Sequence, residues 1–297
     1  MKQITMLVGP PGSGKSTMAH QFLATEGDQI DRTVYVNQDS QGKIKHKEIF
    51  DAAIRDGKDV IVDRMNFNKA QRNGYLESAR KNGYKIVIHV LHQPYDVCMA
   101  RAIARQGHET IKDEENARQA LNFFFRTYER IEDWEADEVH RHYPEGNKPK
   151  AIICDLDGTL CDIEHRRHHV RKTDGSKKNW MAFMDGIKDD KPNQWCIDIL
   201  LGSREKIVFC SGRSENERKA TEEWFLKNLP AGLSIEHTLF MRKSGDSRRD
   251  DIVKEIILDF EILTRYTPYF MIDDRKQVVD MWRKRGFVCL QCDVGDF

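Results

Sequence analysis

The sequence predicts an α/β protein of two domains with a parallel sheet in each half of the chain. Short apolar runs alternate with amphipathic stretches along both halves, as in parallel sheets whose strands are joined by helices. The segment Tyr143–Lys150, with two prolines, a glycine and several charges, separates the halves. We therefore expect one domain in residues 1–146 and a second in residues 147–297, each long enough to bury a core.

Each domain has four apolar runs that we expect to form strands. In the first domain they are Ile4–Val8, Thr33–Val36, Val60–Val62 and Lys85–Leu91. In the second domain they are Ala151–Cys154, Lys206–Cys210, Tyr269–Ile272 and Phe287–Leu290. Ligands bind at the carboxyl edge of such sheets, so the residues that follow each strand are the first candidates for function.

The composition is that of a soluble globular protein, with 39% hydrophobic and 32% charged residues. There is no run of 18 apolar residues and no cleavable apolar leader, so we expect a cytoplasmic protein without membrane contact. The seven cysteines predict reduced thiols, and Cys289 with Cys292 is interpreted as part of a buried strand and not as a zinc site. The net charge of zero gives no support to nucleic-acid binding beyond local patches.

A phosphate-binding loop follows the first strand. Residues 9–16 match G-x-x-x-x-G-K-[ST] directly before a segment that can begin a helix. Such a loop turns its backbone N–H groups toward nucleotide phosphates, while the lysine reaches the β and γ phosphates and the serine binds Mg²⁺. The predicted nucleotide contacts are Gly9, Gly12, Ser13, Gly14, Lys15, Ser16 and Thr17.

Carboxylates follow the next two strands. Asp39 is our candidate general base, since a kinase needs a carboxylate there to accept the proton of an acceptor hydroxyl. The alternative is that Asp39 caps a helix over residues 43–53. Asp63 lies at the position of a second Mg²⁺-site aspartate but is also a candidate for acceptor binding, and Arg72 is a candidate acceptor contact.

Two arginines, Arg101 and Arg105, lie four residues apart and hence on one face of a helix. The guanidinium fork suits a transferring phosphoryl group, so we expect both to act in a lid over the nucleotide phosphates.

The second domain opens with Asp155-Leu-Asp157-Gly-Thr after its first strand. This resembles the first motif of the haloacid dehalogenase (HAD) superfamily of phosphotransferases. In that chemistry Asp155 attacks phosphorus and Asp157 acts as acid and base, and both carboxylates can face Mg²⁺. The other interpretation of such a motif is a calcium loop or a turn.

Three further elements come in the order that the HAD resemblance requires. Ser211 and Arg213 end a strand where they can hold a phosphate, and Lys254 is the expected cation beside the nucleophile. Asp273 and Asp274 close another strand and complete the predicted Mg²⁺ site. The resemblance therefore implies a HAD-like Rossmannoid phosphatase fold.

Residues 164–178 form an insertion rich in histidine, arginine and lysine. In the HAD fold such insertions form a small cap over the active site, and a basic cap suits a polyanionic substrate. A metal site at the histidines and plain solvation are the alternatives.

Taken together, the chain resembles the polynucleotide kinase 3′-phosphatases of the T-even-phage type over nearly its whole length. The most specific stretches are residues 9–17, 101–107, 153–160, 245–256 and 272–286. The resemblance implies an N-terminal P-loop 5′-kinase that uses ATP and Mg²⁺, and a C-terminal 3′-phosphatase acting on 3′-phosphates and 2′,3′-cyclic phosphates. It also implies RNA or DNA ends as substrates, a ligase that acts on the products, and a homo-oligomer.

One position departs from that family. Gly42 stands where the phage enzyme has an arginine that grips the acceptor, and Arg72 or Lys43 are the candidate replacements. Two other functions stay open at this point: a fused metabolite kinase and phosphatase, and a nucleotide-regulated scaffold.

Overall fold

The computed structural model describes residues 2–25, 32–104, 113–171, 176–235 and 237–295. The chain divides into two compact units, Met1–Glu145 and Gly146–Phe297. No helix in these described ranges is both long and apolar enough to cross a membrane.

The first unit is built on a five-stranded parallel sheet in the order β2-β3-β1-β4-β5. Its strands are β1 (Gln3–Val8), β2 (Thr33–Asn37), β3 (Asp59–Asp63), β4 (Lys85–Leu91) and β5 (Glu138–His142). The central strand β1 is buried from Ile4 to Val8, which explains its unbroken apolar run. The four predicted strands are confirmed, whereas β5 is a polar edge strand that no apolar run marks.

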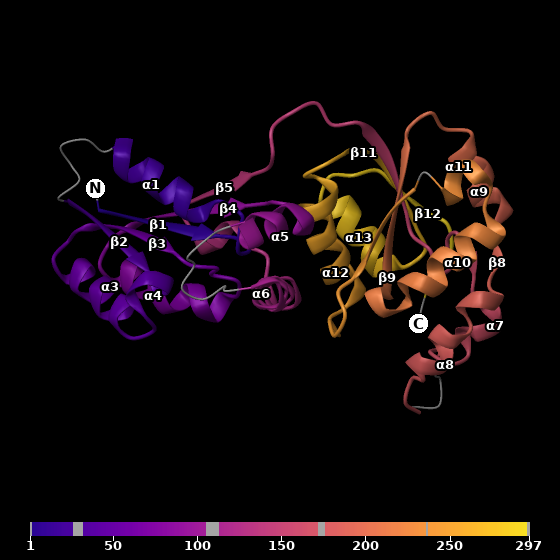
Figure 1. The fold of residues 1–297 in the computed structure, drawn as a ribbon, viewed down its shortest axis with the longest axis horizontal. Helices are drawn as coiled ribbons and strands as arrows, with labels where there is room; N and C mark the ends of the chain where they lie inside the picture. Colours follow the sequence, from indigo (N-terminus) through magenta and orange to yellow (C-terminus); the bar gives the residue numbers. More distant parts are fainter. Residues whose placement is uncertain (1, 26–31, 105–112, 172–175, 236, 296–297) are drawn as a thin grey trace. The chain divides into compact units, whose positions relative to one another are not determined.

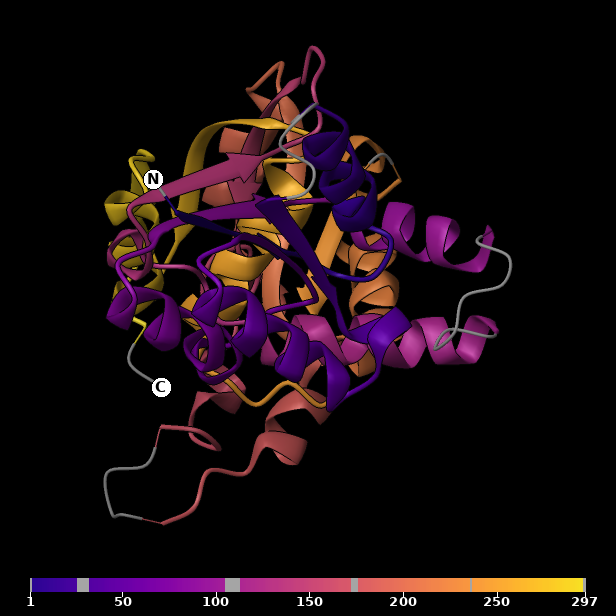
Figure 2. The same ribbon diagram turned by 90° about the vertical axis from the view of Figure 1, so that its left-hand side faces the viewer.

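Helices cover both faces of this sheet, with α1 on one face and α3 and α4 on the other (Figure 1). α5 and α6 pack against each other beside it (Figure 2). The helical segments are α1 (Lys15–Thr25), α2 (Gln38–Gln41), α3 (Lys45–Arg55), α4 (Lys69–Lys81), α5 (Tyr95–Ala104), α6 (Glu114–Thr127) and the short η2 (Asp133–Glu135).

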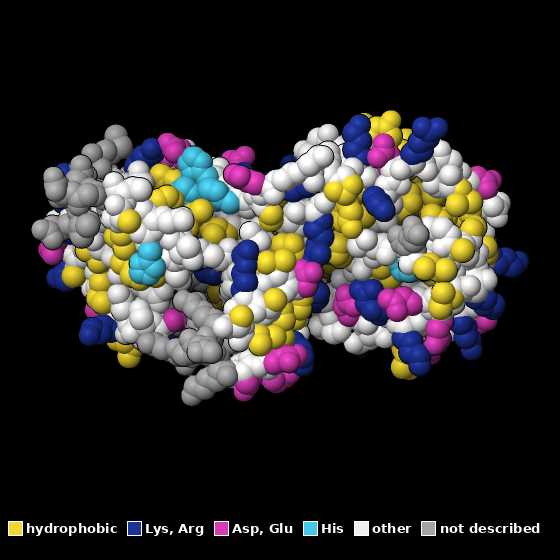
Figure 3. Space-filling view, turned by 45° about the horizontal axis from the view of Figure 1, so that its top comes forward, with side chains coloured by type: hydrophobic (Ala, Val, Ile, Leu, Met, Phe, Trp, Pro, Cys, Tyr) yellow, Lys and Arg dark blue, Asp and Glu magenta, His cyan; other side chains and the backbone are white. Residues whose placement is uncertain are grey.

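Histidine side chains gather on the surface of the first unit (Figure 3). His89 of β4 stacks on His140 and His142 of β5, with ring centroids 4.8 and 5.1 Å apart. Burial, together with the two neighbouring imidazoles, lowers the pKa of His89 to about 4. The His89 ring therefore packs as a neutral group at neutral pH.

The second unit has its own five-stranded parallel sheet in the order β10-β9-β6-β11-β12. The strands are β6 (Lys150–Cys154), β9 (Lys206–Ser214), β10 (Thr238–Arg242), β11 (Thr267–Asp273) and β12 (Cys289–Gln291). The four predicted strands are again confirmed, and β10 was not predicted. Cys289 lies buried in β12, as expected, and each described cysteine is a free thiol.

The helices of this unit flank the sheet, and the insertion after β6 forms a small cap (Figure 1). The cap is bounded by an antiparallel pair, β7 (Cys161–Asp162) and β8 (Lys191–Pro192). It holds α7 (Glu164–Arg167), α8 (Trp180–Asp185) and η3 (Ile187–Asp189). The other helical segments are α9 (Gln194–Leu201), η4 (Glu215–Glu217), α10 (Arg218–Asn228), α11 (Ala231–Ser234), α12 (Asp250–Ile257), the π-helical η5 (Leu258–Ile262) and α13 (Lys276–Lys284).

Two candidate active sites

The loop between β1 and α1 has the geometry of a phosphate cradle. Gly12 has φ +77°, and a Cβ at this position would collide with the carbonyl of Cys98. Lys15 begins α1, is buried, and donates from Nζ to the carbonyl of Pro10 at 2.8 Å. The lysine ammonium is thus held inside the loop, at the N-terminus of a helix, where a phosphate would be bound.

A hydrogen-bonded network joins this loop to the ends of β2 and β3. Tyr35 donates from its hydroxyl to Asp63 Oδ2 at 2.6 Å and also shares a hydrogen bond with Ser16. Asn37 Nδ2 donates to the same Asp63 oxygen at 3.0 Å. Burial and the Asp63 carboxylate raise the pKa of Tyr35, so the phenol keeps its proton. Asp63 therefore lies buried beside the serine of the loop, linked to it through Tyr35.

Asp39 is exposed in the first turn of α2, two residues after the end of β2. Asn37 caps that turn by accepting a hydrogen bond from the N–H of Ser40 at 3.1 Å. The next helix, α3, begins at Lys45 with Ile44 at its N-cap. The alternative in which Asp39 caps that helix is therefore wrong, and its carboxylate is open to solvent at the carboxyl edge of the sheet.

Arg72 does not lie where an acceptor contact is needed. Its side chain is fully buried on α4 and forms a two-pronged ion pair with Glu135, at 2.7 Å from Nε and 2.9 Å from Nη2. Nη1 donates to the carbonyls of Asn66 and Glu129. The prediction that Arg72 binds substrate is corrected, because its nitrogens are committed to protein acceptors inside the unit.

The structure describes one of the two predicted lid arginines. Arg101 is exposed on the last turn of α5. Arg105 lies outside the described residues. The lid therefore stays a prediction.

In the second unit, three carboxylates meet at the carboxyl edge of the sheet. Asp155 follows β6, and Asp273 and Asp274 lie at the end of β11, which pairs with β6 up to Cys154 and Ile272. One oxygen from each of Asp155, Asp273 and Asp274 lies within 4.8 Å of the others, the one such group of three acidic, histidine or cysteine side chains in the described ranges. The register of the two strands thus brings together residues that are far apart in sequence.

A buried lysine neutralises part of this cluster. Lys254 Nζ lies 2.7 Å from Asp155 Oδ1 and 2.8 Å from Asp273 Oδ2. One turn earlier on α12, Asp250 lies 3.7 Å from the same ammonium and also contacts Arg242 and Arg275. Although burial alone would raise it, these cations lower the pKa of Asp250. Lys254 is therefore placed as predicted, and Asp250 is a buried partner that was not predicted.

The cluster fits a divalent cation. Burial and the neighbouring carboxylates raise the pKa of Asp155 despite Lys254, and they raise that of Asp274 to about 7. Both carboxylate oxygens of Asp274 are buried and have no hydrogen-bond partner among the described residues. Three clustered carboxylates, among them Asp274 with two oxygens that accept no hydrogen bond from the described residues, form the donor set that Mg²⁺ prefers, and its charge would stabilise their ionised forms.

Asp157 lies in a different environment from Asp155. Its carboxylate accepts hydrogen bonds from Arg213 of β9 and from Arg166 of the cap helix α7. Burial alone would raise the pKa of Asp157, but the two guanidinium groups outweigh it and hold the pKa well below its ordinary value. The prediction of an Asp157 carboxylate at the metal is corrected, because that carboxylate is paired with two arginines and lies outside the three-carboxylate group.

A second buried carboxylate completes this pairing. Asp190, next to η3, contacts Nε and Nη2 of Arg166 and Nη2 of Arg213. Arg166 also donates to the carbonyl of Phe183 in α8. Two arginines and two aspartates thus join the cap to β9, and Arg166 is neither solvated nor free for phosphate.

A cavity of about 530 Å³ opens over these residues. Asp155, Asp157 and Arg213 line its floor, and Trp180 and Met181 of α8 contribute exposed apolar surface to its wall. Arg242, Arg248 and Arg275 also line it. Ser211 is fully buried next to this cavity, with its hydroxyl accepting a hydrogen bond from the N–H of Arg213 at 3.2 Å.

The second unit matches a known family over nearly its full length. Residues 149–297 match the polynucleotide kinase PNKP phosphatase domain. The chain belongs to this PNKP family. Residues 4–130 match a second family, the AAA domain. The family resemblance and the fold class predicted from the sequence are confirmed: a P-loop unit is followed by a HAD-type PNKP phosphatase unit.

Curated relatives of this chain include two viral proteins. The "Putative bifunctional polynucleotide kinase/RNA ligase" of Autographa californica nuclear polyhedrosis virus is 27% identical over 305 residues, covering 95% of this chain and 41% of its own length. The "Putative bifunctional polynucleotide phosphatase/kinase" of Acanthamoeba polyphaga mimivirus is 29% identical over 96 residues, covering 32% of this chain and 22% of its own length. The chain thus spans less than half the length of these relatives.

Among solved structures, the Pnkp1/Rnl/Hen1 RNA repair complex contains a chain that is 25% identical, with coverage of 100% of this chain and 97% of that one and a TM-score of 0.40.

Several residues near the two sites were not predicted from the sequence. Arg166 and Asp190 lie in the cap, where no sequence motif marks them. Tyr35 lies inside a strand and not at its carboxyl end, where functional residues were expected. Asp250 had a signal, because it precedes Lys254 by four residues and so shares its helix face.

Proposed function

We propose that the chain is a bifunctional enzyme that heals nucleic-acid ends, with a kinase domain in residues 1–146 and a phosphatase domain in residues 147–297. The kinase transfers the γ-phosphate of ATP to a 5′-OH end, and the phosphatase removes a 3′-phosphate or 2′,3′-cyclic phosphate. The observation that carries the proposal is the buried Lys254–Asp155 pair beside Asp273 and Asp274, within a unit that matches the PNKP phosphatase domain.

In the kinase, the P-loop holds the nucleotide. Backbone N–H groups around Gly12 and Gly14 bind its phosphates, and Lys15 turns from the carbonyl of Pro10 to the transferring group. Asp39 accepts the proton of the acceptor hydroxyl, for which its exposed carboxylate is available. Arg101 and Arg105 stabilise charge on the phosphoryl oxygens.

Mg²⁺ in this site would neutralise the nucleotide phosphates, with Ser16 as its protein ligand. We assign Asp63 to this side of the kinase and not to the acceptor. Its carboxylate is buried and hydrogen-bonded to Tyr35, which in turn is bonded to Ser16. Its role is to fix the hydroxyl of Ser16 in place.

In the phosphatase, Asp155 attacks the phosphorus of the 3′-phosphate and the 3′-oxygen leaves, giving an aspartyl-phosphate. Lys254 offsets the charge of Asp155 and of the phosphate. Asp157 protonates the leaving oxygen and then removes a proton from the water that hydrolyses the aspartyl-phosphate. The arginines favour the ionised, water-activating form of Asp157, and a substrate phosphate that draws Arg213 toward itself favours the protonated form.

Mg²⁺ would be held by Asp155, Asp273 and Asp274, where it supplies positive charge to the phosphate oxygens. Ser211 and Arg213 are the proposed phosphate contacts; the buried hydroxyl of Ser211 accepts a hydrogen bond from the N–H of Arg213. The products of the two reactions, a 5′-phosphate and a 3′-OH, are the ends that a nucleic-acid ligase joins, so a ligase is the proposed next enzyme.

The test uses an oligonucleotide with 5′-OH and 3′-phosphate ends, incubated with labelled ATP and Mg²⁺. Label at the 5′ end together with loss of the 3′-phosphate is expected. Lys15→Ala should abolish only the first reaction and Asp155→Asn only the second, because the two sites lie in separate units. Hydrolysis of small phosphomonoesters without any change at the oligonucleotide ends would favour a metabolite phosphatase instead.

A further inference from the structure

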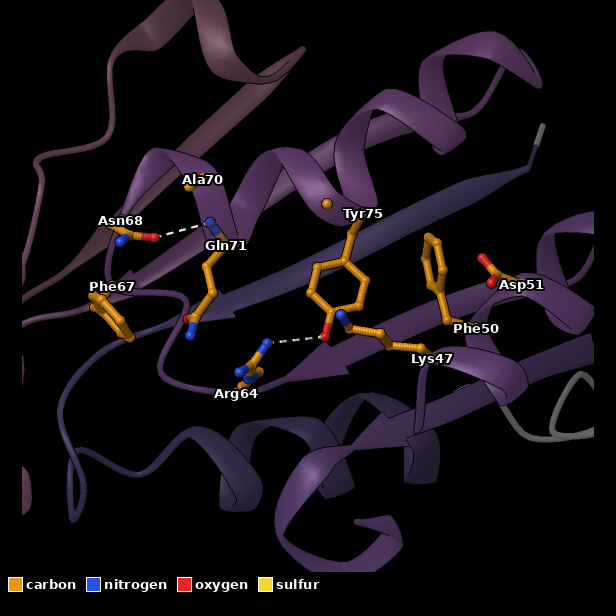
Figure 4. Close-up of a pocket in the computed structure, with 10 residues that line it drawn as sticks. Lys47, Phe50, Asp51, Arg64, Phe67, Asn68, Ala70, Gln71 and Tyr75 are labelled. Atoms are coloured by element: carbon orange, nitrogen blue, oxygen red, sulfur yellow. Dashed lines mark hydrogen bonds between the residues drawn. The ribbon is translucent and has the colours of Figure 1, made fainter. Parts of the chain in front are cut away.

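A second cavity, of about 430 Å³, lies in the first unit between α3 and α4. We call it the α3–α4 pocket. Figure 4 shows side chains from three segments converging on it: α3, the loop after β3, and α4. Its lining residues are Lys47, Phe50, Asp51, Arg64, Phe67, Asn68, Ala70, Gln71, Gly74 and Tyr75.

The polar wall of this pocket is connected to the helix that carries Asp39. Arg64 donates from Nη1 to the hydroxyl of Tyr75 at 3.4 Å, and that hydroxyl lies 2.8 Å from His46 Nε2. His46 Nδ1 lies 2.7 Å from the carbonyl of Gly42. Gly42 caps α2 by donating its N–H to the carbonyl of Gln38. A chain of three hydrogen bonds therefore joins Arg64 to the end of the turn in which the proposed general base lies.

The pocket presents the groups that bind a nucleotide. Arg64 is only partly buried, and its bond to Tyr75 is long, so the guanidinium can turn to an anion. Lys47 is exposed at the rim and adds a second cation, while Asp51 is also exposed there. Gln71 Oε1 is buried and has no hydrogen-bond partner among the described residues, which leaves it for the edge of a base.

Aromatic groups extend this surface beyond the pocket. The buried ring of Phe67 meets the exposed ring of Phe123 edge-on, with centroids 4.9 Å apart. Lys69 Nζ lies 5.5 Å from the ring centroid of Trp134, which is 70% exposed. Cations alternating with exposed rings are the surface on which single strands lie, with phosphates on the cations and bases on the rings.

We propose that the α3–α4 pocket binds the nucleotide that follows the 5′-terminal one in the acceptor strand. Arg64 contacts the phosphate on the 3′ side of this nucleotide, with Lys47 as a second cation, and Gln71 contacts its base. This inference rests on the proposed kinase function and gives it a determinant of substrate class: the site favours a polynucleotide over a mononucleotide. A volume of about 430 Å³ lies within the range of small-ligand pockets, so the pocket is large enough for one nucleotide.

The experiment measures KM for 5′-OH acceptors of increasing length: a nucleoside 3′-monophosphate, a dinucleotide that ends in a 3′-phosphate, and an oligonucleotide. Every protein in the series carries Asp155→Asn, so that the proposed phosphatase leaves the 3′-phosphates in place. Without a further change we expect KM to fall about tenfold or more between the first and the second acceptor, the effect of one arginine–phosphate contact. Arg64→Ala should remove that fall and leave KM for the mononucleotide unchanged. Lys47→Ala, in which only an exposed side chain is lost, should remove part of it.

Salt dependence gives a second readout. Loss of one phosphate contact lowers the slope of log affinity against log salt by about 0.7 for a single strand. Arg55→Ala is the matched control, because Arg55 is an exposed cation on the same helix as Lys47 and does not line the pocket. It should leave both the length dependence and the salt slope unchanged.

Two outcomes would overturn the proposal. In the first, KM falls with acceptor length as much in Arg64→Ala and Lys47→Ala as it does in Arg55→Ala. The other is an equal loss on mononucleotide and dinucleotide, which would place Arg64 at the reacting nucleotide. Failure of the unmodified protein to phosphorylate any nucleic acid is a different result, because it would refute the kinase function itself.

Discussion

Replacing Arg72 by alanine tests whether this arginine holds the first unit together or binds a substrate. In the structure the Arg72–Glu135 pair is buried on both sides, with side-chain exposures of 0% and 1%. Arg72→Ala would leave the Glu135 carboxylate buried without its cation and would also free two backbone carbonyls. Breaking one partner of such a pair costs about 3–5 kcal/mol of the free energy of unfolding.

That loss converts to a measurable shift. With a denaturant slope of about 2 kcal/mol per molar urea, a loss of 3–5 kcal/mol lowers the unfolding midpoint of the first unit by roughly 1.5–2.5 M. Hydrogen exchange read by mass spectrometry across a urea series follows peptides from α4 and β5 separately from peptides of residues 146–297. Only the first set should shift, because the pair lies within Met1–Glu145.

A paired replacement separates charge from packing. Arg72→Met combined with Glu135→Leu removes both charges and keeps apolar volume, so it should recover much of the stability that Arg72→Ala loses. Arg55→Ala, at an exposed position, should shift the midpoint by less than 0.5 M, roughly the effect of a surface change. If Arg72→Ala kept the original midpoint but raised KM for the acceptor, the reasoning would be refuted and the arginine would be a substrate contact.

Three further outcomes are expected. Trp180→Ala should lower kcat/KM for oligonucleotide 3′-phosphates about tenfold, from lost base stacking of about 1–3 kcal/mol, with p-nitrophenyl phosphate hydrolysis unchanged; equal losses on both would contradict a base contact. Mg²⁺ should raise the thermal midpoint of residues 146–297, followed by tryptophan fluorescence, and Asp274→Asn should remove most of that rise; an identical rise in both proteins would place the ion elsewhere. Burial and the neighbouring imidazoles lower the pKa of His89 from 6.5 to about 4, so between these two pH values the unfolded chain binds a proton that the folded protein does not, and the free energy of unfolding falls as the pH drops. Urea midpoints of His89→Asn should therefore change less between pH 6.5 and pH 4 than those of the unmodified protein. An unchanged pH dependence would mean that other groups cause the loss of stability.

The positions of the clustered side chains in the second unit could be predicted because the pattern that marks them is local in sequence. Asp155 and Asp273 lie where an apolar run ends, so the end of a predicted strand marks them, and Lys254 follows in the order of the HAD motifs. Arg166 could not be found this way. Its role depends on how the cap folds back to bring α7 against Asp157 and Asp190, and no local pattern encodes that contact.

For Arg72, by contrast, the surrounding sequence did indicate that its side chain is buried. Buried positions on α4 recur at residues 72, 75, 76 and 79, the spacing of a helix face that packs inward. A single arginine in such a stripe needs a buried acid, and that acid, Glu135, lies 63 residues further along the chain. The face could be predicted, but the partner could not.

The two strands that were not predicted have a simpler cause. β5 (Glu138–His142) is polar because it is an edge strand, with neighbours on one side only, so it needs no apolar run. β10 lies at an edge of the second sheet and is half-buried. Apolar periodicity finds the centre of a sheet more readily than its margins.

The two-arginine, two-aspartate cluster under the cap has a consequence for how a substrate enters. Swinging α7 away from β9 would separate Arg166 from Asp157 and leave charges buried without partners. We therefore expect the cap to stay in place as a rigid wall of the proposed phosphatase site. A strand end would then enter the cavity of about 530 Å³ without a hinge motion of the cap.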